Sequence, residues 1–427
     1  MNFTSSSIRI KLVGAVALLF LLACSTSSVK VSNYSYLYSR DLLLHPEFRV
    51  FNASEDSSYL YFKINTLNLL YTREAKNNDF AARIKVEVGA FNNFSDKFPF
   101  YRDSSEYLDI DNGQLAKDLI GRFSLPLPAG RNYVIKVNVT DLNRNTSDTK
   151  IIRVLKEGQL IDRQGFLAVD AYTKVPVISK ILKNEKQLLI SHHLEERQEV
   201  NVTFFDPSIY LARPPFDTEA PQREMVRPYA TYTLYDSAGY FPLEVIDRTG
   251  IYFIQSDTNS FMGTTFFKFA GNHPMVTTGE QMVGPLQYIA SNEEFRKLIQ
   301  APNKKIAAEN FWIEHCGSRE RAREVIRAFY KRVEEANEFF TSYKEGWKTD
   351  RGMIYIIFGP PDGLYMRDGG ESWVYGQESN VNSINLVFIK NENPFSDNDL
   401  VLQRSLAYRP NWYLAVDYWR TGRIFTL

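Results

Sequence analysis

Two aspartates, Asp350 and Asp362, flank a short apolar run and are the first candidates for a pair of catalytic carboxylates. If that run, Met353 to Phe358, is an extended strand, a rise of about 3.3 Å per residue puts the two acids roughly 20 Å or more apart. Paired carboxylates in glycosidases lie within about 5–10 Å of each other. The sequence therefore predicts no acid–base pair here unless a partner carboxylate comes from elsewhere in the fold.

Two histidine-containing segments could bind a metal ion or activate a thiol. Residues 192–196 read His-His-Leu-Glu-Glu, but neighbouring residues on a strand point to opposite faces, so the two histidines would not converge. His315 precedes Cys316, but adjacent helical residues project too far apart to share a proton well. There is no glycine-rich phosphate loop followed by lysine, no HExxH and no GxSxG. We therefore expect no catalytic residue, no metal and no small-molecule cofactor.

The N-terminus has the pattern of a cleaved secretory signal. A basic stretch at residues 9–11 precedes an apolar core at residues 12–22, which is too short for the roughly 20 apolar residues that a membrane span needs. Residues 1–23 are therefore predicted to be a signal peptide. The end of this segment, Leu-Leu-Ala-Cys at residues 21–24, resembles the bacterial lipobox, and that resemblance implies lipidation of Cys24.

Residues 24–46 are expected to be the lipidated cysteine and its tether. Ser25 to Lys30 is small and polar, the composition of a flexible linker. It lacks the aspartate beside the cysteine that in enterobacteria favours the inner membrane. It also lacks the acidic cluster that resembles a surface-export signal in lipoproteins of the Bacteroidota. We expect a protein anchored to the outer membrane and facing the periplasm.

The composition excludes some classes of partner and of covalent structure. The 427 residues include 50 basic and 50 acidic side chains, so no excess charge attracts nucleic acid, and none is expected as a partner. After lipidation, Cys316 is the only thiol left and no internal disulfide can form. All five tryptophans follow residue 311, which indicates a separate C-terminal unit.

The pattern from residue 47 to residue 157 has a period of two. Apolar residues alternate with polar ones near residues 60–64, 83–88 and 133–140, as in antiparallel strands with one face in a core. We predict a β-sandwich of immunoglobulin-like type. Residues 158–275 are predicted to be a second β-rich domain, with a long proline-containing loop between Asp206 and Tyr229.

From residue 276 to residue 427 the period becomes helical, which predicts an α+β domain. Ser318 can cap a helix from Arg319 to Ser342, and Gly346 can end it in the left-handed conformation. Further helical candidates are Pro285 to Ile289, Asn292 to Ile299, Lys305 to Glu314, and the segment around Trp412, Ala415, Val416 and Trp419. The overall prediction is a mostly β chain with one or two N-terminal sandwiches followed by this domain.

The most specific motif is the string GWKTDRGMIYIIFGPPD at residues 346–362. Together with Phe311-Trp312 upstream and the run ESWVY at 371–375 downstream, it resembles the GWxTD domain, a family found in envelope proteins of Bacteroidota and related bacteria. The resemblance covers roughly residues 300–376. One departure is that this chain has Glu-His-Cys-Gly at residues 314–317, where the family follows its Phe-Trp pair with a basic-acidic-proline stretch. The family implies no established enzymatic activity.

We expect the motif to serve the architecture of the domain. Trp347 is large enough to plug a junction between helix and strand. Thr349 and Asp350 can cap backbone donors, and Arg351 can pair with a carboxylate. Glycines and a stiff turn complete the set of motif residues: Gly346, Gly352, Gly359, Pro361 and Asp362.

The function expected from these features is non-catalytic. We expect an outer-membrane-anchored scaffold or adaptor in an envelope complex for secretion, gliding or outer-membrane assembly. Its partners would be the membrane, through Cys24, and other envelope proteins. The alternative is a glycan-binding or glycan-hydrolysing lipoprotein, which would require a cleft lined by exposed tryptophan and at least two convergent carboxylates.

Overall fold

The computed structural model describes residues 32–38, 42–73, 79–113, 116–192, 197–208, 210–219, 225–377, 380 and 383–426. The predicted signal peptide and Cys24 lie outside these residues. The described helices and strands all fall within Tyr34–Leu427, which forms one compact unit by its internal contacts. Among them no helix is long and apolar enough to cross a membrane.

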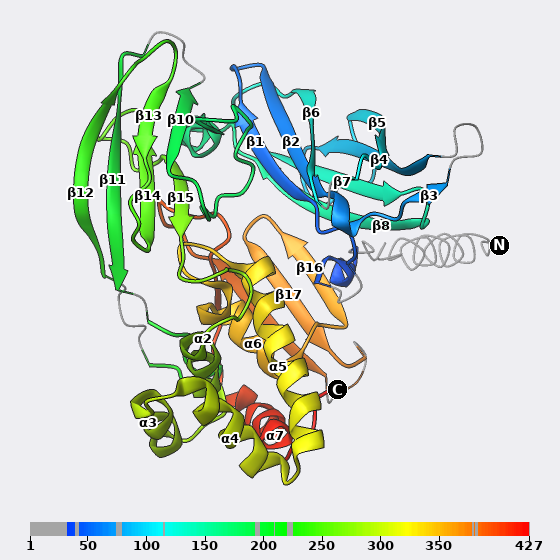
Figure 1. Ribbon diagram of the computed structural model, residues 1–427, viewed down its shortest axis with the longest axis vertical. Coiled ribbons are helices and arrows are strands. Elements are labelled where there is room, and N and C mark those ends of the chain that lie inside the picture. Colours follow the sequence, from blue (N-terminus) through cyan, green and yellow to red (C-terminus); the bar gives the residue numbers. More distant parts are fainter. Residues whose placement is uncertain are drawn as a thin grey trace, which may run out of the picture. The chain divides into compact units, whose positions relative to one another are not determined.

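The first β-region is an antiparallel sandwich, as its period of two predicts (Figure 1). One sheet has the order β1-β2-β6, and the other has the order β3-β4-β7-β8 with β5 paired to β4. Inward-facing residues such as Phe62, Ile84 and Val137 share one core between the sheets. The strands are β1 (Glu47–Asn52), β2 (Ser57–Asn65), β3 (Thr72–Arg73), β4 (Phe80–Phe91), β5 (Tyr101–Ile110), β6 (Asp118–Pro126), β7 (Tyr133–Asp141) and β8 (Thr146–Val154).

The second β-region also consists of two antiparallel sheets around one core. The orders are β13-β10-β9 and β12-β11-β14-β15, and Ile190, Phe204 and Tyr252 lie in the shared core. A 3₁₀ segment, η3 (Gly158–Gln164), precedes it. The strands are β9 (Phe166–Asp170), β10 (Gln187–His192), β11 (Glu199–Ser208), β12 (Met225–Tyr235), β13 (Phe241–Glu244), β14 (Gly250–Gln255) and β15 (Thr264–Lys268).

The proline-rich loop is shorter than the sequence predicts, because β11 and β12 extend into it from both sides. Pro228 lies within β12, and the ladder shifts register between Phe204 and Phe205 at that point. Proline is tolerated there because β12 is an edge strand. Pro207 lies in β11 beyond Phe205, the last residue that pairs with β14, so its missing N–H interrupts no ladder on that side.

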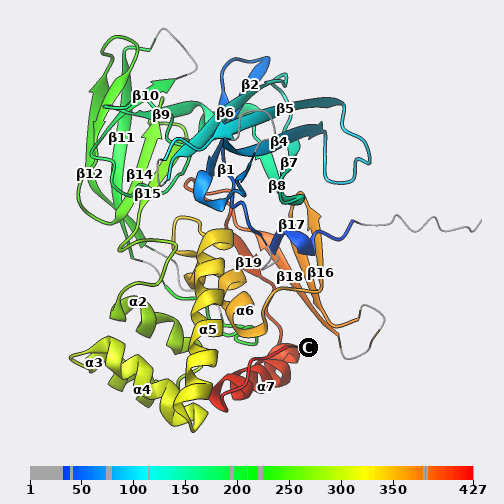
Figure 2. The same ribbon diagram turned by 45° about the vertical axis from the view of Figure 1, so that its right-hand side comes forward.

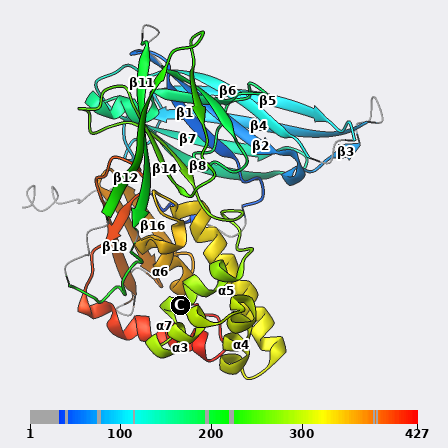
Figure 3. The same cartoon turned by 60° about the vertical axis from the view of Figure 1, so that its left-hand side comes forward.

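The C-terminal region is α+β, as predicted. Its sheet has the order β16-β17-β18-β19, and α5 and α6 lie beside it in Figures 1 and 2. Figure 3 shows α3, α4 and α7 gathered near one end of α5. The elements are α2 (Gly279–Val283), η4 (Gly284–Tyr288), α3 (Asn292–Gln300), α4 (Lys304–Cys316), α5 (Arg319–Phe340), η5 (Gly346–Lys348), α6 (Asp350–Phe358), β16 (Gly363–Arg367), β17 (Gly370–Tyr375), β18 (Ile384–Lys390), β19 (Leu400–Leu402), η6 (Leu406–Tyr408) and α7 (Arg409–Arg420).

Helix α5 begins where its sequence signal places it. The Ser318 side chain accepts a hydrogen bond from the backbone N–H of Arg321 and caps the helix. An apolar stripe along α5, which includes Val325, Phe329 and Phe340, is buried. In α7 the spacing of Trp412, Ala415 and Trp419 likewise buries all three side chains.

Two predictions around the motif are wrong. Met353 to Phe358 is helical, not extended, because Thr349 caps α6 and every residue of this helix is buried. A short apolar run that is buried on all sides has no helical periodicity to distinguish it from a core strand. Gly346 does not end α5, which stops at Phe340. Instead, a Cβ on Gly346 would lie 1.9 Å from the carbonyl oxygen of Ala336, so close packing is what requires glycine there.

Candidate functional site

The GWxTD motif forms the turn from η5 into α6. The Thr349 hydroxyl accepts from the N–H of Gly352 at 3.0 Å and donates to the carbonyl of Gly346 at 2.8 Å. Gly352 lies so close to the preceding turn that a Cβ would sit 1.9 Å from the Gly346 oxygen. The Trp347 ring contacts Tyr288 edge-on and lies against Gly284. Trp347 therefore fills a junction between helical segments, not the helix–strand junction that the sequence suggested.

Asp350, the acidic residue of the motif, is held by distant partners. Its two carboxylate oxygens accept from both terminal nitrogens of Arg404, at 2.6 and 2.9 Å. One of them also accepts from the backbone N–H of Leu402 at 2.8 Å. This is the bidentate geometry of a strong charge-assisted pair. Because Arg404 also donates to the carbonyl of Arg213 at 3.1 Å, Asp350 joins α6 to β19 and to the β11–β12 connection.

Arg351 lies in a second buried network. Its Nη1 donates to Glu371 at 2.9 Å, and Glu371 also accepts from Tyr38 at 3.0 Å and from the Trp373 indole at 2.9 Å. Burial lowers the pKa of Arg351, but Glu371, Tyr38 and Asp399 together outweigh it, and the net shift is upward. This network connects α6 to β17 and to the N-terminal 3₁₀ turn η1 (Ser35–Tyr38).

The turn after α6 separates Asp362 from the hydrogen-bond networks of Asp350 and Arg351. Gly359 adopts φ +90°, and a Cβ there would approach Arg332 to 2.9 Å. The Gly359 carbonyl accepts from the Tyr375 hydroxyl at 2.8 Å, and Pro361 is buried. Asp362 is exposed and accepts from the N–H of Gly376 at 2.7 Å. The structure therefore binds the two motif aspartates to different groups and does not assemble them into a carboxylate pair.

A cavity of about 1030 Å³ adjoins Asp350. We call it the motif-side cavity. It is lined by the β11–β12 connection, η4, β18, β19 and the segment between β18 and β19. Its aromatic lining residues are Tyr210, Tyr288, Tyr343, Phe395 and Trp412, and its charged ones are Arg213, Lys344, Asp350, Lys390, Asp399 and Arg404.

The charged groups of the motif-side cavity are mostly engaged with one another or with amides. Asp399 accepts from the side chains of Asn391 and Asn393, at 2.6 and 3.2 Å. Burial, and then the nearby Asp350 charge, raise the pKa of Tyr288 well above its ordinary value. The Tyr288 hydroxyl donates to the Trp347 carbonyl at 2.9 Å. The walls are thus pre-arranged for binding and hold no free acid–base pair among the described residues.

The weaker sequence candidates do not assemble into sites. His192 ends β10, while residues 193–196 lie outside the described residues. In the part of the chain that the structure describes, no group of three or more His, Cys, Asp or Glu residues is placed to hold a metal ion. His315 contacts the Phe311 carbonyl at 2.7 Å. Cys316 is only 2% exposed, and burial raises the pKa of its thiol. A thiolate nucleophile is therefore disfavoured.

Residues 250–421 match the family model of the GWxTD domain, so this part of the chain is a GWxTD domain. The match begins at β14, inside the second β-region, and continues into α7. No curated protein matches the chain. The residue that sequence reasoning missed is Arg404, which lies 54 positions from Asp350. The one sequence signal for Arg404 is its residue type, because arginine is suited to pairing with a carboxylate.

Proposed function

We propose that this protein is a non-catalytic envelope scaffold, anchored in the outer membrane through lipidated Cys24 and facing the periplasm. Its GWxTD domain docks a segment of a partner envelope protein in the motif-side cavity. The observation that carries this proposal is the binding of Asp350 by Arg404 and Leu402. The acidic side chain of the motif, Asp350, is held in an ion pair in the cavity wall, so it is not free for acid–base chemistry. We therefore infer that the cavity serves binding.

The chemistry of the lining supports a peptide-like occupant. Tyrosine and other aromatic side chains offer large contact area with a polar tip. The lining holds four cationic side chains and two acidic ones, and this positive balance favours acidic or carbonyl groups. A volume near 1030 Å³ is at the upper end of what small-ligand sites occupy. Several side chains of an extended segment would fit in it.

A glycan is the second candidate occupant, favoured by the same tyrosines because sugar rings pack on aromatic faces. The tryptophans do not favour it, since all five are buried, including Trp412 in the cavity wall. Asp350 and Asp399 both line the cavity but are held by other groups. Hydrolysis of a glycan therefore has no support in the described residues, and binding alone remains as this alternative.

Blocking the motif-side cavity should abolish function without unfolding the protein. Val401 lies in β19 between two buried leucines, is half-buried and lines the cavity. Val401→Trp should therefore place a large side chain in this space. We expect an unchanged melting temperature, loss of complementation in a deletion strain, and loss of co-purifying partner. The matched control is Val175→Trp, at an exposed position outside the cavity. If Val401→Trp complements as well as Val175→Trp does, the cavity is not the docking site.

Removing the lipid acceptor should release the protein from the membrane. Cys24→Ala should yield a soluble protein or an unprocessed precursor, because a thiol is needed for acylation. The measurement is membrane fractionation together with labelling by a fatty-acid analogue. A Cys24→Ala protein that stays membrane-bound, is mature in size and carries no label would contradict the anchor.

A further inference from the structure

A second cavity of about 380 Å³ lies among β1, β8, η3, α5 and β18. We call it the basic cavity. Seven of its lining residues are cationic and three are acidic: Arg49, Lys150, Arg153, Arg163, Lys180, Arg351 and Lys390 against Glu338, Glu371 and Asp397. These charged residues come from all three regions of the chain, so no single helix or strand accounts for the excess of positive charge.

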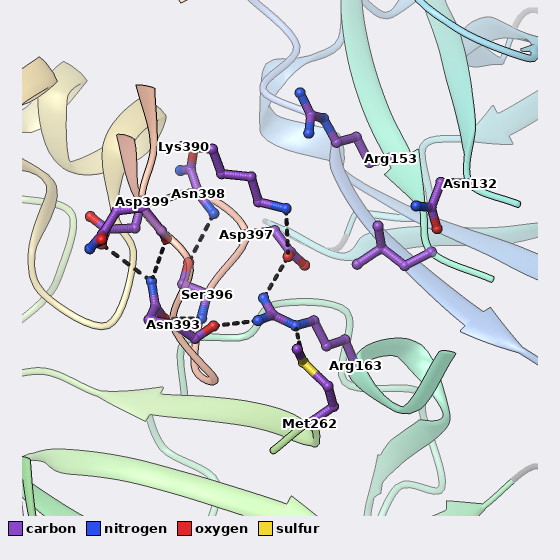
Figure 4. A network of polar contacts seen from close by, with 12 residues as sticks. Asn132, Arg153, Arg163, Met262, Lys390, Asn393, Ser396, Asp397, Asn398 and Asp399 are labelled. Atoms are coloured by element: carbon purple, nitrogen blue, oxygen red, sulfur yellow. Dashed lines mark hydrogen bonds and ion pairs between the residues drawn. The ribbon is translucent and has the colours of Figure 1, made fainter. Parts of the chain in front are cut away.

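Most of these cations have partners. Arg163 and Lys390 approach the same carboxylate, Asp397, at 2.5 and 3.8 Å (Figure 4). Lys150 lies 4.0 Å from Glu338. Arg351 is bound to Glu371, and Arg153 donates to the carbonyls of residues 367 and 368. Each of the three carboxylates in the lining is therefore already paired with a cation.

Arg49 is a cation that the described residues leave without a counter-charge. It is 4% exposed, and its Nη2 donates only to the Phe166 carbonyl at 3.3 Å. Its Nη1 is buried with no hydrogen-bond partner. The guanidinium lies 4.6 Å from the ring centroid of Phe266. Burial lowers the pKa of Arg49 to about 10, a sign that the charged form lacks compensation.

Lys180, which is half-buried, is a second cation close to Arg49. Its ammonium group makes no ion pair or hydrogen bond within the described part of the chain. Burial, and then the neighbouring Arg49 charge, lower its pKa to about 8, although the Asp397 carboxylate, which already pairs with Arg163 and Lys390, opposes the shift. Burying an unpaired cation such as Arg49 is costly, and a second positive charge close to it adds to that cost. A fold retains such a pair only with compensation, and a bound anion would supply it.

We propose that the basic cavity binds a phosphate group, with Arg49 and Lys180 as its principal ligands. Arg49 has no counter-charge among the described residues, and Lys180 shares Asp397 with two other cations, so the cavity has an excess of positive charge that suits a dianion. The planar guanidinium of Arg49 suits the oxygens of phosphate, and the ammonium of Lys180 adds a point charge. At about 30 Å³ per water molecule, the cavity has room for roughly a dozen waters. A phosphate monoester therefore fits as well as the inorganic ion.

This site is distinct from the motif-side cavity and goes beyond the proposed function. The segment between β18 and β19 contributes to both, since Asn393 and Phe395 line one cavity and Asp397 and Asn398 line the other. Arg163 also donates to the Asn393 carbonyl (Figure 4). The two cavities are tested by separate variants, so failure of one leaves the other standing.

The test is calorimetric titration of inorganic phosphate into the purified full-length protein, against a chloride control of equal ionic strength. We expect saturable binding. Lys180→Gln and Arg49→Gln should each lower the phosphate affinity by roughly 10- to 100-fold, the loss of a hydrogen bond to a charged group. Lys305→Gln, an exposed lysine on α4, is the matched control and should bind as the wild type does.

The variants should fold, because Arg49→Gln removes a buried charge without a counter-charge and Lys180→Gln changes a half-buried side chain, and their melting temperatures without phosphate should not fall. A vesicle arm identifies the source of the phosphate. Binding to phosphatidic acid vesicles that depends on Lys180 assigns it to a lipid headgroup, whereas phosphate binding without vesicle binding assigns it to a soluble ligand. Absence of saturable phosphate binding, or equal binding by Lys180→Gln and Lys305→Gln, overturns the proposal.

Discussion

Replacing Gly352 with alanine should destabilise the protein severely. In an ordinary helix this substitution gains about 1 kcal/mol of helix propensity. Here the added Cβ would lie 1.9 Å from the Gly346 oxygen and 2.8 Å from the Gly346 carbonyl carbon. Backbone cannot rotate away as a side chain can, so α6 must shift within a fully buried site. We expect a loss in the free energy of unfolding of about 3 kcal/mol or more, the upper end of over-packing costs.

Gly369→Ala is the matched control for Gly352→Ala. A Cβ at Gly369 would have nothing within 4 Å, and its φ is not in the left-handed range. We expect a change within about 0.5 kcal/mol. Chemical denaturation of the two variants and the wild type makes the comparison. Equal stability of Gly352→Ala and Gly369→Ala would contradict the close packing of η5 on α6.

Asp350→Asn should also be strongly destabilising, because it removes the charge that neutralises Arg404. The two side chains are 9% and 14% exposed, so water compensates little. Losing one partner of such a pair costs about 2–5 kcal/mol, and we expect the lower half of that range since asparagine keeps one oxygen acceptor. Arg404→Gln should be destabilising for the matching reason.

The double variant Asp350→Asn/Arg404→Gln should lose less stability than the sum of the two single losses. Groups that contact each other give coupling free energies of about 0.5–3 kcal/mol in such cycles. Denaturation of the four proteins measures this coupling. Strictly additive losses would mean that the ion pair contributes nothing to holding β19 on α6.

The sequence predicts the β-regions well because their signal is local. Alternation near residues 60–64 and 133–140 requires only that one face be buried, and the sandwich buries it. Helix α5 was equally predictable from the sequence, because its Ser318 cap and the apolar stripe that includes Phe329 are local features. In both cases the spacing of apolar residues along the sequence matches the face that the folded element buries.

The motif was harder to interpret because its structure depends on distant residues. Helix α6 is buried on all sides, so its residues show no polar face that could reveal a helical period. Asp350 pairs with Arg404, and Arg351 pairs with Glu371. Tertiary packing brings these partners together, so the local spacing of residues does not predict them. The basic cavity was unpredictable for the same reason, because Arg49, Lys180 and Lys390 meet only in the folded chain.

The measurement that tests the central claim most directly is complementation by Asp350→Asn as a function of temperature, with abundance and folding followed in parallel. If Asp350 is architectural, the variant should complement a deletion strain at any temperature where it is folded. It should fail only where it unfolds, several degrees below the wild type. A folded, normally abundant Asp350→Asn protein that fails to complement at every temperature would contradict this account, and would place a reactive carboxylate at the centre of the motif.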